Sequence, residues 1–160
     1  MDVQLFRIDD RLIHGQVVLS WVKYLKSERI ILCDNDVVEN AWEKELYVSC
    51  VPKSLECMVS NTKDTTNYIL HNITRSEKTI VLVKSPAVLK EITDYGFVPE
   101  KVNIGGIHYT EKRREYLPYI FLSDDDVADI EFLAKKGIKM YCQDVPTSKK
   151  YNILDLINSK

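Results

Sequence analysis

Short apolar runs alternate along the chain with segments whose apolar residues recur every three or four positions. A continuous apolar run of about five residues predicts a strand that is buried on both faces, as in a parallel sheet. Apolar residues at helical spacing instead predict a helix with one buried face. The predicted strands cover 3–8, 29–33, 56–59, 79–83, 101–104, 118–122 and 138–142, and the predicted helices cover 17–25, 38–46, 64–70, 86–92, 123–134 and 153–157.

Residues that typically begin and end helices stand at the borders of these segments. Ser85 followed by Pro86 indicates a helix start, and Gly96 indicates its end. Ser123 precedes three aspartates, which suit the positive end of a helix dipole, and Gly137 ends that helix. Strands and helices therefore alternate with short connections. This order predicts an α/β fold with an open, mostly parallel sheet and helices on both faces.

The composition is that of an ordinary globular domain, with 45% apolar and 29% charged residues. The length of 160 residues, without a linker or repeat, predicts a single domain over residues 1–160. A net charge of −2 gives no reason to expect nucleic acid or an anionic membrane as a partner. No apolar run approaches the roughly 20 residues of a membrane helix, and the N-terminus does not resemble a signal peptide. We therefore expect a cytoplasmic protein.

The four cysteines do not predict a metal or redox site. Cys33, Cys50, Cys57 and Cys142 form no C-x-x-C pair, and none has a histidine at the spacing of a zinc site. Because Cys33 and Cys142 end apolar runs, we expect both to be buried thiols.

A polar loop joins the first predicted strand to the first predicted helix, within the sequence RIDDRLIHGQVV at residues 7–18. Sites in open α/β sheets form beyond the carboxyl ends of the strands, and free N–H groups at a helix start suit phosphate. Three further polar stretches, 34–36, 84–86 and 105–108, also follow predicted strands. We therefore expect all four stretches to lie along one edge of the sheet.

His14 is the side chain of this loop best suited to covalent chemistry. A neutral imidazole is a nucleophile near neutral pH, and the N–P bond it forms is labile enough to pass the group on. Arg11 would clamp the phosphate oxygens with its forked guanidinium. The N–H groups of Gly15, Gln16 and Val17 would add donors at the helix start. The sequence thus predicts that His14 carries a phosphoryl group.

The roles of the two aspartates stay open at this level. Asp9 or Asp10 would hold the second ring nitrogen of His14, or would brace Arg11. Either carboxylate would serve equally well as a cap for the turn or the helix. Arg11 would alternatively form a surface ion pair that contributes little to stability.

The run at residues 7–17, with Trp21 beyond it, resembles the signature of a known family. That family is the IIB component of the mannose/fructose/sorbose class of the bacterial phosphoenolpyruvate-dependent sugar phosphotransferase system. The resemblance extends to 102–106, 123–126 and 143–147, and so spans nearly the whole chain. It implies a mainly parallel seven-stranded sheet with flanking helices, in a free-standing IIB protein without a fused IIA domain.

The resemblance also implies roles for individual residues. The loop histidine of the family takes a phosphoryl group from a phosphohistidine on IIA and gives it to a sugar entering through membrane components IIC and IID. Carried over, His14 is the carrier, bonded through Nδ1, Arg11 stabilises the phosphate, and Asp10 is a candidate for orienting the ring. The implied activity is that of a protein-phosphohistidine–sugar phosphotransferase, with no cofactor and no metal, associated peripherally with the membrane transporter.

Two other classes of function would use the same edge. A nucleotide- or phosphate-ester-binding α/β enzyme would want a glycine-rich first loop, which here holds only Gly15. A histidine phosphatase would have arginine in place of Ile13. A regulatory module would dock a partner without turnover. His108 is expected to face this edge, and His71 to be a solvated bystander.

The sequence leaves the transported sugar open and is compatible with a homo-oligomer. The charged run at 111–116 is bulkier than the family pattern leads us to expect, and we interpret it as a solvated loop.

Overall fold

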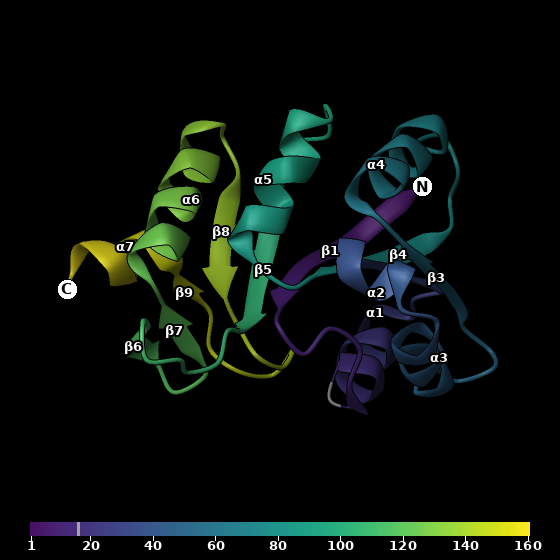
Figure 1. Cartoon of the computed structure of the whole chain (residues 1–160), viewed down its shortest axis with the longest axis horizontal. Coiled ribbons are helices and arrows are strands. Elements are labelled where there is room, and N and C mark those ends of the chain that lie inside the picture. The colour runs from purple at the N-terminus through teal and green to yellow at the C-terminus, as the bar shows by residue number, and fades with distance from the viewer. Residues whose placement is uncertain (16) are drawn as a thin grey trace.

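The computed structural model describes residues 1–15 and 17–160, and a seven-stranded sheet forms its centre (Figure 1). The strands of this sheet are β1 (Asp2–Asp9), β2 (Arg29–Cys33), β3 (Glu56–Ser60), β4 (Lys78–Val83), β5 (Lys101–Gly106), β8 (Lys139–Cys142) and β9 (Tyr151–Asn152). Their order is β3-β2-β4-β1-β5-β8-β9, and all neighbours run parallel except β8 and β9. The predicted mostly parallel seven-stranded sheet is confirmed.

Helices cover both faces of this sheet, as the sequence predicts. The first face is covered by α4 (Thr62–His71), α5 (Pro86–Asp94), α6 (Asp124–Lys135) and α7 (Ile153–Asn158). The opposite face is covered by the π-helix η1 (Val17–Val22), α1 (Lys23–Leu25), α2 (Asn35–Glu39) and α3 (Ala41–Ser49). In Figure 1 these two groups of helices lie on opposite sides of the strands.

The continuous apolar runs form strands because each strand serves two hydrophobic cores. In β4, Ile80 and Leu82 pack beneath η1 and α2, while Val81 and Val83 pack beneath α5 and α6. Successive side chains of a strand point to opposite faces, so a strand covered on both sides needs apolar residues at every position. The predicted burial of Cys33 and Cys142 is confirmed as well.

Three local features differ from the sequence prediction. The helical pattern at 38–46 is two helices, because Asn40 ends α2 and its side chain accepts the Glu43 N–H that begins α3. Part of the supposed solvated loop at 111–116 lies in a hairpin of β6 (Arg114–Leu117) and β7 (Ile120–Leu122). The short antiparallel strand β9 was not predicted, since two residues carry no detectable alternation.

The polar stretches identified in the sequence follow strands that end at one edge of the sheet. In the register, the last residues of β1 lie beside Val83 of β4 and Gly106 of β5, and Cys33 of β2 also lies beside Val83. The loop after β1 is therefore central on this edge, with the loops after β4 and β5 on either side. Among residues 1–15 and 17–160, no helix combines the length and apolar character needed to cross a bilayer.

Candidate active site

The loop after β1 is fixed by two buried side chains and a tight turn. Leu12 and Ile13 are almost fully buried, and the N–H of Leu12 donates to the carbonyl of Asp9 at 2.9 Å. Leu12 has a φ of +57°, a left-handed conformation that a bulky residue adopts only when its surroundings hold it there. This conformation buries the two apolar residues and leaves Arg11 and His14 at the surface, with side chains 39% and 17% exposed.

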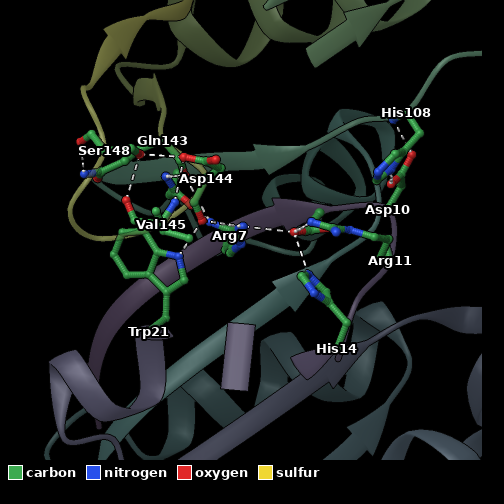
Figure 2. A network of polar contacts seen from close by, with 12 residues as sticks. Arg7, Asp10, Arg11, His14, Trp21, His108, Gln143, Asp144, Val145 and Ser148 are labelled. Carbon is green, nitrogen blue, oxygen red and sulfur yellow. Dashed lines mark hydrogen bonds and ion pairs between the residues drawn. The ribbon is translucent and has the colours of Figure 1, made fainter. Parts of the chain in front are cut away.

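Asp9 is the hub of the site. Its carboxylate is completely buried and contacts Arg7, Arg11 and His14, three side chains that are labelled in Figure 2. Arg7 Nη2 lies 3.0 Å from Oδ2, and His14 Nε2 lies 3.1 Å from the same oxygen. Arg11 donates its backbone N–H to Oδ1 at 3.1 Å, and its Nε lies 3.3 Å from that oxygen. One carboxylate therefore sets the position of both the histidine and the surface arginine.

The charge state of Asp9 determines which nitrogen of His14 is free. Burial by itself raises the pKa of Asp9, but the hydrogen bond from His14 and the positive charges of Arg7 and Arg11 outweigh it and lower the pKa to about 2. An ionised carboxylate only accepts hydrogen bonds, so Nε2 of His14 carries the proton. The lone pair of the neutral ring is therefore on Nδ1, the nitrogen that faces away from Asp9.

Arg7 forms a fully buried ion pair with Asp9. The Arg7 side chain is fully buried and donates to Asn103 Oδ1 and to the carbonyls of Gln143 and Asp144. Its guanidinium carbon lies 5.5 Å from the centre of the Trp21 ring, and Trp21 Nε1 donates to the same Asp144 carbonyl. Arg7 was not among the predicted site residues, although a charge between Phe6 and Ile8 in an apolar run signals a buried ion pair.

Gly105 makes room for this buried cation. A methyl group at its Cβ position would lie 1.7 Å from the guanidinium carbon of Arg7. A Cβ on Gly106 would meet only the ends of the Asp9 and Arg11 side chains, at 3.3 and 3.4 Å. The double glycine of β5 thus permits the close approach of Arg7 to the strand rather than forming a phosphate loop.

Asp10 contacts different partners from those of Asp9. Its carboxylate accepts from the backbone N–H of His108 at 2.7 Å, contacts the Nδ1 atom of the same residue, and lies 3.6 Å from Arg113. The residue pattern left the contact to the His14 ring open between Asp9 and Asp10, and the resemblance favoured Asp10; in the structure Asp9 makes it. The reason is the pleat of β1, in which residues two apart share a face, so that Asp9 and not Asp10 lies beside Arg7.

The remaining positions named from the sequence are Gly15, Gln16, Val17 and His71. Apart from its neighbours in the chain, no described atom lies within 4 Å of the Cβ position of Gly15, and η1 begins at Val17. The expected contribution of Gln16 lies outside the described residues. The ring of His71 is hydrogen-bonded to the Asn67 carbonyl, one turn earlier in α4. In the described part of the chain, no group of three or more His, Cys, Asp or Glu residues is arranged to hold a metal ion.

A second polar cluster lies at the ends of β2 and β4. Lys84 Nζ is 2.9 Å from the carboxylates of both Asp34 and Asp36. The Asp34 side chain also accepts from two N–H groups at the start of α2. The amine of Lys84 is therefore committed to an ion-pair cluster that caps a helix.

Comparison with known proteins agrees with this architecture. The family described as PTS system sorbose subfamily IIB component matches residues 3–160. The PTS system sorbose-specific EIIB component of Klebsiella pneumoniae is 30% identical over 159 residues, which are 99% of this chain and 96% of that protein. The PTS system mannose-specific EIIAB component of Escherichia coli (strain K12) is 26% identical over 158 residues, which are 99% of this chain but 49% of that protein.

A solved structure supports the same assignment. The crystal structure of the IIBSor domain of the sorbose permease from Klebsiella pneumoniae superimposes with a TM-score of 0.92 and 28% sequence identity, covering 100% of this chain and 98% of that one. The matched fold, the family match over residues 3–160 and the polar loop after β1 agree with one another. The chain therefore belongs to the sorbose subfamily of phosphotransferase-system IIB components, which are sugar phosphotransferases.

Proposed function

We propose that His14 is the phosphoryl carrier of this protein, charged by a phosphohistidine on a IIA protein and discharged to a sugar during uptake. The observation that carries the proposal is the bond between His14 Nε2 and the ionised carboxylate of Asp9. That bond leaves the Nδ1 lone pair available, and the same carboxylate holds Arg11.

The charging step follows from this arrangement. Nδ1 of His14 attacks phosphorus while the bond from phosphorus to the donor nitrogen breaks and its electron pair returns to the donor ring. The ring of His14 then carries a positive charge with its proton on Nε2, and Asp9 stabilises that charge. A phosphorylated imidazolium is a good leaving group, so the same contact keeps the phosphoryl group transferable.

Arg11 and the backbone at the helix start are the proposed phosphate ligands. Asp9 fixes Nε and the backbone N–H of Arg11, so the guanidinium is positioned before the phosphate arrives. Phosphoryl transfer depends mainly on such positioned charge, because the charge spreads over the equatorial oxygens in the transition state. We assign the N–H groups of Gly15, Gln16 and Val17 to the same task. Asp9 takes the orienting role, and no metal is assigned.

The proposed partners are a IIA donor and the membrane components IIC and IID. Support for the donor comes from the mannose-specific EIIAB component, because this chain matches 49% of a protein whose name joins A and B parts. The proposed location is the cytoplasmic side of the membrane transporter. Relatives named for fructose, N-acetylgalactosamine and sorbose, at 23% to 30% identity, do not single out one sugar.

The test is phosphoryl transfer from labelled phospho-IIA to the purified protein. We expect stoichiometric labelling that is labile in acid and stable in alkali, as a phosphohistidine is. His14→Ala should abolish the labelling, whereas the matched variant His71→Ala should label like the wild type, because the exposed ring of His71 is bonded to a carbonyl of its own helix, α4. Equal labelling of the His14→Ala variant would overturn the proposal.

A further inference from the structure

Two consecutive aspartates at the end of β1 each contact one imidazole, but they contact different ring nitrogens. Asp9 contacts Nε2 of His14, and Asp10 contacts Nδ1 of His108. Figure 2 shows His14 and His108 on the same side of the drawn network, with Arg11 between Asp10 and His14. The first pair leaves Nδ1 of its ring available, and the second pair leaves Nε2.

The Asp10–His108 pair is held by contacts from three elements. Asp10 accepts the His108 N–H, and its own N–H donates to the Gly106 carbonyl at 3.0 Å. Arg113 donates to the carbonyl of His108 at 3.0 Å and pairs through Nε with Asp126 at the start of α6. The imidazole is thus anchored on one side.

The other side of the His108 ring is open. The side chain is 52% exposed, and within residues 1–15 and 17–160 its Nε2 has no hydrogen-bond partner. Anchored orientation on a carboxylate, together with a free second nitrogen, is the arrangement of a general base.

We propose that His108 accepts the proton of the sugar hydroxyl when the phosphoryl group leaves His14; this inference rests on the proposed function. The hydroxyl oxygen forms a bond to phosphorus as the bond from phosphorus to Nδ1 of His14 breaks, and the electron pair of that bond returns to Nδ1. The hydroxyl proton passes to Nε2 of His108. Asp10 stabilises the resulting imidazolium, as Asp9 does for His14.

Other groups at this edge are committed elsewhere. Asp9 is fully buried and engaged by Arg7, Arg11 and His14. Lys84 is paired with two carboxylates. The charged groups that face His108 are Asp10 from the β1 loop and Arg113 from the segment before β6, and Arg113 is itself paired with Asp126. His108 is therefore an exposed imidazole that is held by a residue of the carrier loop, Asp10. The position of Arg113 gives the charged segment at 111–116 a role in anchoring this base.

The experiment separates charging from discharge. Wild type, His108→Gln, Asp10→Asn and the matched control His71→Gln are charged with labelled phospho-IIA. Each is then mixed with membrane vesicles that contain the cognate IIC and IID components and with fructose, sorbose, mannose or N-acetylgalactosamine. The rates of label uptake and label release to sugar are followed between about pH 5 and 8.

We expect His108→Gln to charge at the wild-type rate and to discharge about 10²-fold more slowly. Wild-type discharge should slow toward acidic pH, because a doubly protonated imidazole accepts no proton, and this decline should be absent in His108→Gln. Asp10→Asn should show the same split between charging and discharge, to a smaller extent.

Two results would overturn the inference alone. One is a His108→Gln variant that discharges with the rate and pH profile of His71→Gln. The other is an equal slowing of charging and discharge, which would indicate a purely structural contact. A wild-type protein that takes no label from phospho-IIA would instead overturn the proposed function, and the inference with it.

Discussion

The carboxylate of Asp9 lies 3.1 Å from Nε2 of His14 and 3.0 Å from Nη2 of Arg7, so one buried anion joins the surface imidazole to a buried cation. This contact fixes the tautomer of His14 and determines where its lone pair points. It also means that stability and reactivity depend on the same side chain.

Replacing Asp9 with Asn should impair both properties. The ring of His14 would no longer be held in one tautomer, and charging from phospho-IIA should fall by roughly 10²-fold or more. The buried guanidinium of Arg7 would lose its counter-charge, which should reduce the free energy of unfolding by about 3–5 kcal/mol. Single-turnover charging rates and urea denaturation measure the two effects. A variant with wild-type stability would show that Arg7 does not depend on this pair.

Acid should weaken the fold through Asp9. Its pKa is about 2 in the folded protein against an ordinary 3.8, so the folded state binds the proton less readily than the unfolded chain. The resulting stabilisation, about 2 kcal/mol at most, is fully present above about pH 4 and is lost as the pH falls toward 2. The stability difference between wild type and Asp9→Asn should therefore shrink from pH 4 to pH 2. A difference that stays constant over this range would contradict the assigned shift.

Arg11→Lys should slow charging without loss of stability. Lysine keeps the positive charge but lacks the fork that engages Asp9 and two phosphate oxygens together, so we expect a charging rate lower by roughly 10²-fold. Because the Arg11 side chain is 39% exposed, the denaturation midpoint should change little. Arg75→Lys, at another surface ion pair, is the matched control. Normal charging by Arg11→Lys would show that charge alone suffices.

The two glycines of β5 should respond differently to alanine. In Gly105→Ala the new methyl group would lie 1.7 Å from the guanidinium carbon of Arg7, and we expect a loss of about 3 kcal/mol or more in unfolding free energy. In Gly106→Ala the neighbours are side-chain ends at 3.3 and 3.4 Å, which can shift, so the loss should be about 1 kcal/mol. Thermal unfolding of the two variants provides the comparison, and equal losses would contradict the role given to Gly105.

The sheet and the position of the loop could be predicted because they depend on local patterns. The strands β2 and β4 are built on unbroken apolar runs, and Ser85 and Ser123 cap their helices as expected. The predicted strand at 118–122 contains β7, which pairs with β6 outside the main sheet, whereas β6 escaped prediction because it is short and Arg114 and Glu115 conceal the pattern. Its pairing is decided by contacts with the rest of the fold.

The pleat of β1 favours Asp9 over Asp10 as the partner of Arg7. A charged residue such as Arg7 within a buried strand requires an acid on the same face, and the pleat places that acid two residues away. The contact of Asp10 with His108 spans 98 positions, so no local pattern reveals it.

The hydrogen bonds of Arg7 join positions that are 96, 136 and 137 residues apart in the chain. During synthesis, the carbonyls of Gln143 and Asp144 are among the last of these groups to leave the ribosome, long after His14 has emerged. Until these two carbonyls reach their places, the guanidinium of Arg7 lacks two of its hydrogen-bond acceptors. In a growing chain, His14 would therefore be exposed well before its site is complete. Newly made protein would accept a phosphoryl group only when its C-terminal strands are in place.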